Sequence, residues 1–124
     1  MVRLAVLILS MAGLAGCATA PGSPKVTTNY GEYRDGSEHP AVLMLFQQAD
    51  EAMQAGKPAM ALTYLDQARR IEPRNPYVLY RQARAYAVAD DNEKARQLLE
   101  RARVFASPDD EMINYLLYEL EFQL

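Results

Sequence analysis

The sequence predicts an all-α domain behind two N-terminal segments that do not belong to it. Three observations predict this fold class. Residues 40–124 match themselves at an offset of 34 residues, their apolar residues recur at helical spacing, and proline-containing breaks divide them into helix-length pieces. A chain of 124 residues is long enough for one small domain.

The internal repeat is visible in both halves of a two-helix unit. Matched positions in the first half are Leu45, Gln48, Ala49 and Leu79, Gln82, Ala83. Matched positions in the second half are Ala61, Leu65, Ala68, Arg69 and Ala95, Leu99, Ala102, Arg103. Two helices approach closely only where side chains are small, and leucines fill the gaps between them. The period therefore predicts two helix pairs stacked on each other.

We expect five helices, over residues 40–54, 58–72, 76–89, 92–106 and 109–122. Pro58 suits a first helical turn, where its missing N–H costs nothing. The prolines of Glu72–Pro76 break the helix between the repeats, since proline disfavours helix at the residue before it. About three units are usually needed for a stable stack, so the fifth helix is expected to cap the second repeat.

The last helix is unusually apolar. Its inner stripe is expected to cover the second repeat and consists of Met112, Ile113, Leu116, Leu117 and Leu120. Three aromatic residues, Tyr115, Tyr118 and Phe122, lie off this stripe. Either they fold against the stack, which we expect, or they form a dimer or partner surface.

These repeats resemble the tetratricopeptide repeat, a 34-residue motif of two helices. Ala49 and Ala83 match its small residue, Ala61 its alanine, and Pro73 its closing proline. The chain departs from the motif at four positions, namely Leu45 and Leu79 (for tryptophan), Ala52 (for tyrosine) and Ser107 (for the closing proline). The resemblance implies a short array of two repeats plus one capping helix.

The resemblance also implies a partner-binding groove lined by the first helix of each repeat. The residues expected to face it are Leu43, Phe46, Asp50 and Met53, then Tyr77, Tyr80 and Arg84, then Asn114, Tyr118 and Glu121. Aromatic residues and arginine are enriched at interface hot spots. Family members that clamp a carboxylate use lysine and asparagine, which are replaced here, so an apolar or mixed segment with an acid opposite Arg84 is expected. Alternatively, Phe46 and Tyr80 complete the core between repeats.

The N-terminus carries the features of a secretory signal. A run of 13 uncharged residues follows Arg3, shorter than the roughly 20 needed to cross a bilayer. It ends in Leu14-Ala15-Gly16-Cys17, which resembles the bacterial lipobox. That resemblance implies cleavage of a signal peptide over 1–16 and acylation of Cys17, and two or three lipid chains make a stable anchor.

Residues 17–39 are expected to form the lipidated cysteine and a flexible linker before the domain at 40–124. The stretch 18–39 holds two prolines, three glycines and no sustained apolar period. Tyr30 and Tyr33 within it either dock onto the domain or a partner, or are solvated. No other cysteine is present to pair with Cys17.

Composition excludes several classes of function. A net charge of −3 argues against a general nucleic-acid binder. The single histidine, His39, is expected to be solvated beside a helix start. We find no metal-ligand spacing and no phosphate loop, and expect neither an enzyme nor a cofactor beyond the lipid on Cys17. Charge is uneven, with a basic excess over 69–103 and five acids without a base over 109–124.

The expected function is therefore a lipid-anchored adaptor for a protein partner. In a Gram-negative source, Ala18 and Thr19 lack the aspartate that retains lipoproteins in the inner membrane, so we expect an outer-membrane lipoprotein facing the periplasm. Small lipoproteins of this kind activate a peptidoglycan synthase (a penicillin-binding protein), the role we expect, or pilot a secretin in type IV pilus assembly. A homodimer through the last helix, with no groove ligand, is the remaining alternative.

Overall fold

The computed structural model describes residues 36–124, which form five α-helices and no strand. They are α2 (Pro40–Gln54), α3 (Pro58–Ile71), α4 (Pro76–Val88), α5 (Asn92–Phe105) and α6 (Glu111–Gln123). The predicted all-α fold is confirmed, and every predicted helix boundary agrees to within two residues. The signal peptide, Cys17 and most of the linker lie outside the described residues. No helix of the described part combines the length and apolarity needed to span a membrane.

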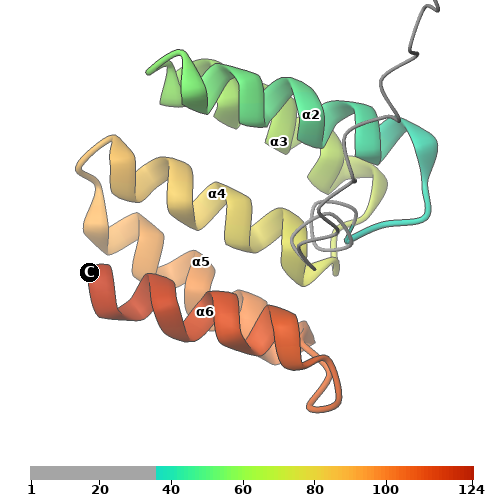
Figure 1. The fold of residues 1–124 in the computed structure, drawn as a ribbon, viewed down its shortest axis with the longest axis vertical. Coiled ribbons are helices and arrows are strands. Elements are labelled where there is room, and N and C mark those ends of the chain that lie inside the picture. The colour runs from blue at the N-terminus through green and yellow to red at the C-terminus, as the bar shows by residue number, and fades with distance from the viewer. Residues whose placement is uncertain (1–35) are drawn as a thin grey trace, which may run out of the picture.

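The helices form two stacked pairs and a fifth helix (Figure 1). In this view α2, α4 and α6 make up a front row, and they run in the same direction. Helices α3 and α5 lie behind this row, each connected to the front helix that precedes it. The stack places the first helix of each repeat on one face of the molecule, as the resemblance implies.

The sequence supplies a cap for most helices. His39 precedes α2, and its Nδ1 accepts a hydrogen bond from the Ala41 N–H at 3.2 Å. Asn75, Asp91 and Asp110 cap α4, α5 and α6 in the same way. Such caps satisfy N–H groups that have no partner within the helix. Proline occupies the first helical position of α2, α3 and α4, as expected for Pro58.

The internal period extends to the turns within the pairs. Gly56 and Asp90, which are 34 residues apart, both have a positive φ, of 71° and 65°. The next residue in each turn donates its N–H back to the helix, from Lys57 to the Ala52 carbonyl and from Asp91 to the Tyr86 carbonyl, both at 2.9 Å. This left-handed ending is typical of helix C-termini, and aspartate tolerates it better than most residues. The two pairs therefore turn alike.

The core consists of two apolar clusters that share helix α4. One lies among α2, α3 and α4, and the other among α4, α5 and α6. The matched alanines of both repeats are buried, which allows the close helix approach. On α6 the predicted stripe is confirmed at Ile113, Leu117 and Leu120, which are buried, whereas Met112 and Leu116 are only half-buried. The last helix caps the second repeat.

The aromatic residues of α6 correct the expectation that they fold against the stack. Tyr115, Tyr118 and Phe122 are 49%, 58% and 80% exposed. Helix α6 packs against α4 and α5 with its apolar stripe, which already fills that contact. The three side chains lie on the exposed part of the helix surface, and the rings of Tyr118 and Phe122 contact each other.

Candidate partner-binding surface

Tyr80 lies at the centre of the face formed by α2, α4 and α6. Its ring is half-buried and packs against the cluster of α4, α5 and α6. Charged residues of all three helices act on its hydroxyl: Asp50 from α2, Arg81 and Arg84 from α4, and Glu119 from α6. The stack therefore brings together groups from distant parts of the chain, since Asp50 and Glu119 are 69 positions apart.

The surroundings of Tyr80 extend the protonated form of its hydroxyl to higher pH, mainly through burial. Burial raises the pKa of this phenol above its usual value of 10 because it disfavours the charged form. Arg84 and Arg81 lower that pKa, whereas Asp50 and Glu119 raise it, and the net shift is upward. At neutral pH the group is a neutral hydroxyl that can donate a hydrogen bond to a partner.

Arg81 joins α4 to α2. Its guanidinium carbon lies 3.9 Å from the ring centre of Phe46, and its Nε lies 3.8 Å from Asp50 Oδ1. The flat cation is attracted to the face of the ring, most strongly where water is excluded. Sequence reasoning missed Arg81. The signal for it was its position one residue after Tyr80, about 100° further around the helix and toward the preceding repeat.

Phe46 corrects the expectation that it lines the groove. It is 1% exposed and belongs to the core cluster of the first repeat. The alternative, that it completes core packing between the repeats, is right for this residue. Asp50 remains half-buried at the edge of the surface, and Leu43 and Met53 are half-buried on the same helix. Met53 packs against the first core cluster.

Arg84 is the accessible cation of this face. It is exposed, one turn beyond Tyr80 on α4, and within residues 36–124 it forms no ion pair. The charge is therefore available to an acidic group of a partner. Among the predicted residues, Tyr80 and Arg84, with Asp50 beside them, are the ones that the fold gathers into one constellation.

The predicted residues of α6 are partly engaged elsewhere. Asn114 Nδ2 donates to the backbone carbonyls of Ser107 and Asp110, each at 2.8 Å. Glu121 forms an ion pair with Arg103 of α5. All three of these residues are exposed, and within residues 36–124 Tyr118 is the one without a polar contact to the rest of the domain. The α6 residue that influences Tyr80 is Glu119, which sequence reasoning did not single out.

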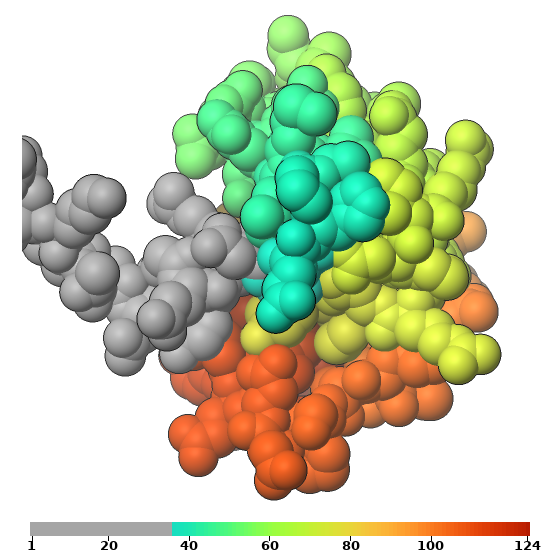
Figure 2. Space-filling model, turned by 90° about the vertical axis from the view of Figure 1, so that its right-hand side faces the viewer, coloured from blue at the N-terminus to red at the C-terminus, as the bar shows by residue number. Residues whose placement is uncertain are grey.

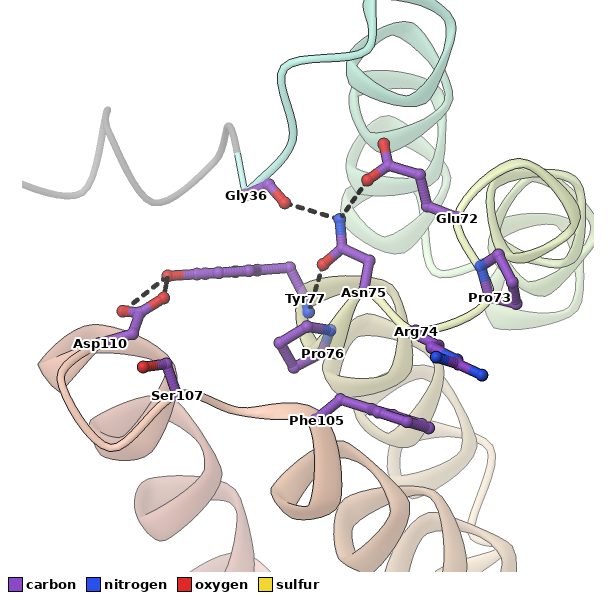
Figure 3. A pocket seen from close by; sticks show the side chains of 10 residues that line it. All are labelled: Gly36, Glu72, Pro73, Arg74, Asn75, Pro76, Tyr77, Phe105, Ser107 and Asp110. Carbon is purple, nitrogen blue, oxygen red and sulfur yellow. Dashed lines mark hydrogen bonds between the residues drawn. The ribbon is translucent and has the colours of Figure 1, made fainter.

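Tyr77 lines a separate cleft at the end of the stack where α4 begins (Figure 3). The cleft has a volume of about 510 Å³, and its lining residues are Gly36, Glu72, Pro73, Arg74, Asn75, Pro76, Tyr77, Phe105, Ser107 and Asp110. The Tyr77 hydroxyl donates to the Asp110 carboxylate, at 2.9 Å from Oδ2. Tyr77, in the first turn of α4, is thus hydrogen-bonded to the α5–α6 connection and does not join the surface around Tyr80.

The start of the described chain is held at the rim of this cleft. Asn75 Nδ2 donates to the Gly36 carbonyl at 2.6 Å, and the Ser37 hydroxyl donates to Glu72. Gly36 has a φ of +36° and lies so close to the Tyr77 ring that a Cβ would clash with it. In Figure 2 the first described residues, in teal, lie against the yellow-green connection between α3 and α4. Gly36 and Ser37, which precede helix α2, therefore contact the connection between α3 and α4.

Within the described part of the chain, histidine, cysteine, aspartate and glutamate form no group arranged to hold a metal ion. Asp91 and Asp110 act as helix caps. The one histidine uses its Nδ1 to cap α2.

Comparison with known proteins agrees with this architecture. Residues 52–117 match the tetratricopeptide repeat family. This segment runs from the last turn of α2 into the apolar stripe of α6, and so contains the helices around Tyr80. No curated protein and no solved structure matches the chain. Because the family match covers more than half of the chain, the protein belongs to the tetratricopeptide repeat family.

Proposed function

We propose that the protein is a lipid-anchored adaptor that binds a partner protein through the surface around Tyr80. The observation that carries the proposal is the constellation of Tyr80, Arg84 and Asp50 on the row of first helices. Tetratricopeptide repeats are protein-interaction modules, which makes this row the expected docking face. Tyrosine and arginine are residue types that dominate binding energy when a partner excludes water from them.

The chemistry of this surface indicates the kind of segment that it binds. Arg84 offers a charge that is not neutralised by an ion pair within residues 36–124. Tyr80 offers a protonated hydroxyl on a half-buried ring. We propose an apolar or mixed segment that places one acidic group on Arg84, since hydrogen bonds between charged groups are roughly twice as strong as neutral ones.

The lipobox at Leu14-Ala15-Gly16-Cys17 supports the proposed anchor. Acyl chains on Cys17 would hold the protein in a membrane. A linker of about 20 residues has an r.m.s. span of roughly 25 Å, so the domain would stay near the membrane surface. For a Gram-negative source we propose the outer membrane, facing the periplasm.

We propose that the partner is a peptidoglycan synthase of the penicillin-binding type. The support is the combination of a lipobox with a short array, because the pilot lipoproteins of type IV pilus secretins carry longer arrays than five helices. A pilot role is the second candidate. The exposed rings of Tyr115, Tyr118 and Phe122 favour a third, a homodimer through α6 without a groove ligand.

Light scattering and partner capture on the chain carrying Cys17→Ser separate these candidates. For the adaptor we expect a monomer that retains a protein labelled by a fluorescent penicillin from envelope extracts. Tyr80→Ala and Arg84→Glu each should lower this capture about tenfold, a loss of 1.4 kcal/mol. The matched control is Val104→Ala, at a residue that is 76% exposed on α5.

Two results would contradict the proposal. Undiminished capture by both Tyr80→Ala and Arg84→Glu would show that the partner does not bind at this face. A tight dimer that Tyr118→Glu dissociates, with no captured protein, would establish the homodimer instead. Capture of a secretin in place of a penicillin-labelled protein would support the adaptor function but assign it to the pilot role.

A further inference from the structure

The exposed side of α6 presents two aromatic rings in contact with each other. Tyr118 and Phe122 are one helical turn apart, and their ring centres lie 5.7 Å from each other at an interplanar angle of 55°. Phe122 is 80% exposed, more than any other large apolar residue among those described. Large contiguous apolar patches are uncommon on monomeric proteins and mark interaction sites, and two exposed rings in contact contribute to such a patch.

Acidic residues surround these rings. The stretch from Asp109 to Leu124 carries five acids and no lysine or arginine. Of these acids only Glu121 forms an ion pair within the described residues, with Arg103. Glu119 lies three residues before Phe122 and so is its neighbour on the helix surface, while Glu111 lies two turns before Tyr118 on the same side of the helix; both are exposed. Glu119 also acts on Tyr80, so it stands at the border between the two surfaces. We call Tyr118, Phe122, Glu111 and Glu119 the α6 face.

The interface between α2 and α4 contains a comparable pair of an aromatic ring and an acid, which another residue of this chain covers. There, the ring of Phe46 and the carboxylate of Asp50 belong to α2, and the residue that covers them is Arg81 of α4. The guanidinium packs on the ring and compensates the acid at the same time, and it is nearly removed from water in doing so. A cation from an adjacent helix is therefore how this molecule covers an aromatic residue beside an acid.

We propose that the α6 face binds a basic amphipathic helix of another protein, which lies alongside α6 as an additional helix of the stack. Apolar residues of that helix cover Tyr118 and Phe122, and its lysines or arginines face Glu111 and Glu119. This goes beyond the function proposed above, because the Tyr80 surface selects an acidic group and the α6 face selects basic ones. The two faces have opposite charge preferences.

Charge also favours a basic helix over two other occupants of the α6 face, a second copy of the chain and an anionic membrane. A second copy of the chain would bring the same acids against each other, and like charges across an interface cost several kcal/mol. An anionic membrane attracts basic segments and repels acidic ones. Both alternatives place negative charge on negative charge, whereas a basic helix compensates it.

The test uses the chain carrying Cys17→Ser and a fluorescein-labelled peptide of leucine and lysine, about 14 residues long, which makes about four turns of an amphipathic helix. Fluorescence anisotropy measures its binding. We expect saturable binding that Tyr118→Ser combined with Phe122→Ser weakens at least about tenfold. Glu111→Gln combined with Glu119→Gln should weaken binding and reduce its dependence on salt, since paired charges are screened by ions.

Matched controls locate the binding. Met44→Ser combined with Val104→Ser removes two exposed apolar residues from α2 and α5 and should leave the affinity unchanged. Tyr80→Ala should also leave it unchanged, so failure here is distinct from failure of the proposed adaptor function. A peptide of leucine and glutamate should not bind.

Three outcomes would overturn the proposal. These are equal binding by the α6 variants and the wild type, equal binding of the glutamate peptide, and a dimer in light scattering that Phe122→Ser dissociates. Circular dichroism of each variant checks that the helices remain. The substituted side chains of α2, α5 and α6 are exposed, so their loss should leave the fold intact, whereas Tyr80 is half-buried and its variant needs this check most.

Discussion

Arg81 shows how one residue determines the role of its neighbours. Its guanidinium covers Phe46 and lies beside Asp50, so a ring that the sequence places on the partner face becomes part of the interior. The same contact leaves Arg84 as the accessible cation of α4, since the two arginines lie three residues apart and point in different directions. The make-up of the surface around Tyr80 therefore depends on a residue that is itself hardly accessible.

At this scale we predict that Phe46→Ala destabilises the protein by about 3–5 kcal/mol, the usual cost of removing a buried phenylalanine. Urea unfolding followed by circular dichroism measures the change. The control is Met44→Ala on the same helix, at a residue that is 58% exposed, for which a change within about 0.5 kcal/mol is expected. Similar losses for both variants would be incompatible with a buried Phe46.

Tyr80 gives the stability a specific dependence on alkaline pH. Its pKa is raised in the folded state, so the folded protein keeps a proton that the unfolded chain releases above pH 10. The resulting stabilisation is complete below pH 10 and is lost as the pH rises through the raised pKa. We expect the free energy of unfolding to fall less steeply above pH 10 in Tyr80→Phe than in the wild type. Tyr118→Phe, at an exposed ring, is the control, and an equal slope in all three proteins would argue against burial of the Tyr80 hydroxyl.

At the scale of elements, Asp110 has two functions and Asp91 has one. Both cap a helix by accepting a backbone N–H. Asp110 also accepts the hydroxyl of Tyr77, which ties the α5–α6 connection to the start of α4. The hydrogen bond between Tyr77 and Asp110 therefore holds this end of the stack, and Asp91 makes no equivalent contact among the hydrogen bonds described.

We predict that Asp91→Ala costs about 1 kcal/mol, the usual value for a helix cap. Asp110→Ala should cost about 1 kcal/mol more, since it also removes the acceptor of the Tyr77 hydroxyl. Chemical denaturation measures both losses. Asp110→Ala, Tyr77→Phe and the variant that combines them form a double-mutant cycle. If Tyr77→Phe costs the same in the presence and absence of Asp110, the two side chains are not coupled.

The helices were predictable because their determinants are local. Proline at helix starts and the alanine–leucine period act within a few residues, and they placed every boundary closely. The roles of Phe46, Arg81 and Glu119 were not predictable in this way, since each depends on which residue of another helix lies opposite. The exposure of Tyr118 and Phe122 depends likewise on how many neighbours α6 has. Periodicity finds the apolar stripe of a helix but not what covers the remaining surface.

The whole molecule combines two chemically different faces on one short stack. The row of α2, α4 and α6 presents Arg84 beside Tyr80, and the outer side of α6 presents acids beside exposed rings. In the account proposed here the N-terminal lipid holds this stack at a membrane, where one face selects an acidic segment and the other a basic helix. Such an arrangement suits a protein that joins two components.

For the whole molecule we predict that Cys17→Ser releases the protein from membranes. The substitution removes the thiol that receives the lipid, and acyl chains provide about 0.8 kcal/mol for each buried methylene. Fractionation of cells expressing either form measures this. Met44→Ser, a change outside the anchor, should remain membrane-bound. A Cys17→Ser form that stays in the membrane fraction would contradict the lipobox interpretation.

The central claim is that a partner protein docks on the face around Tyr80. The most direct measurement is crosslinking in living cells with a photoreactive amino acid at position 80, in the full chain with its own signal. We predict one discrete crosslinked product, which is lost when Arg84→Glu is added and is absent when the probe stands at position 104. No product at position 80, or the same product at both positions, would contradict the claim.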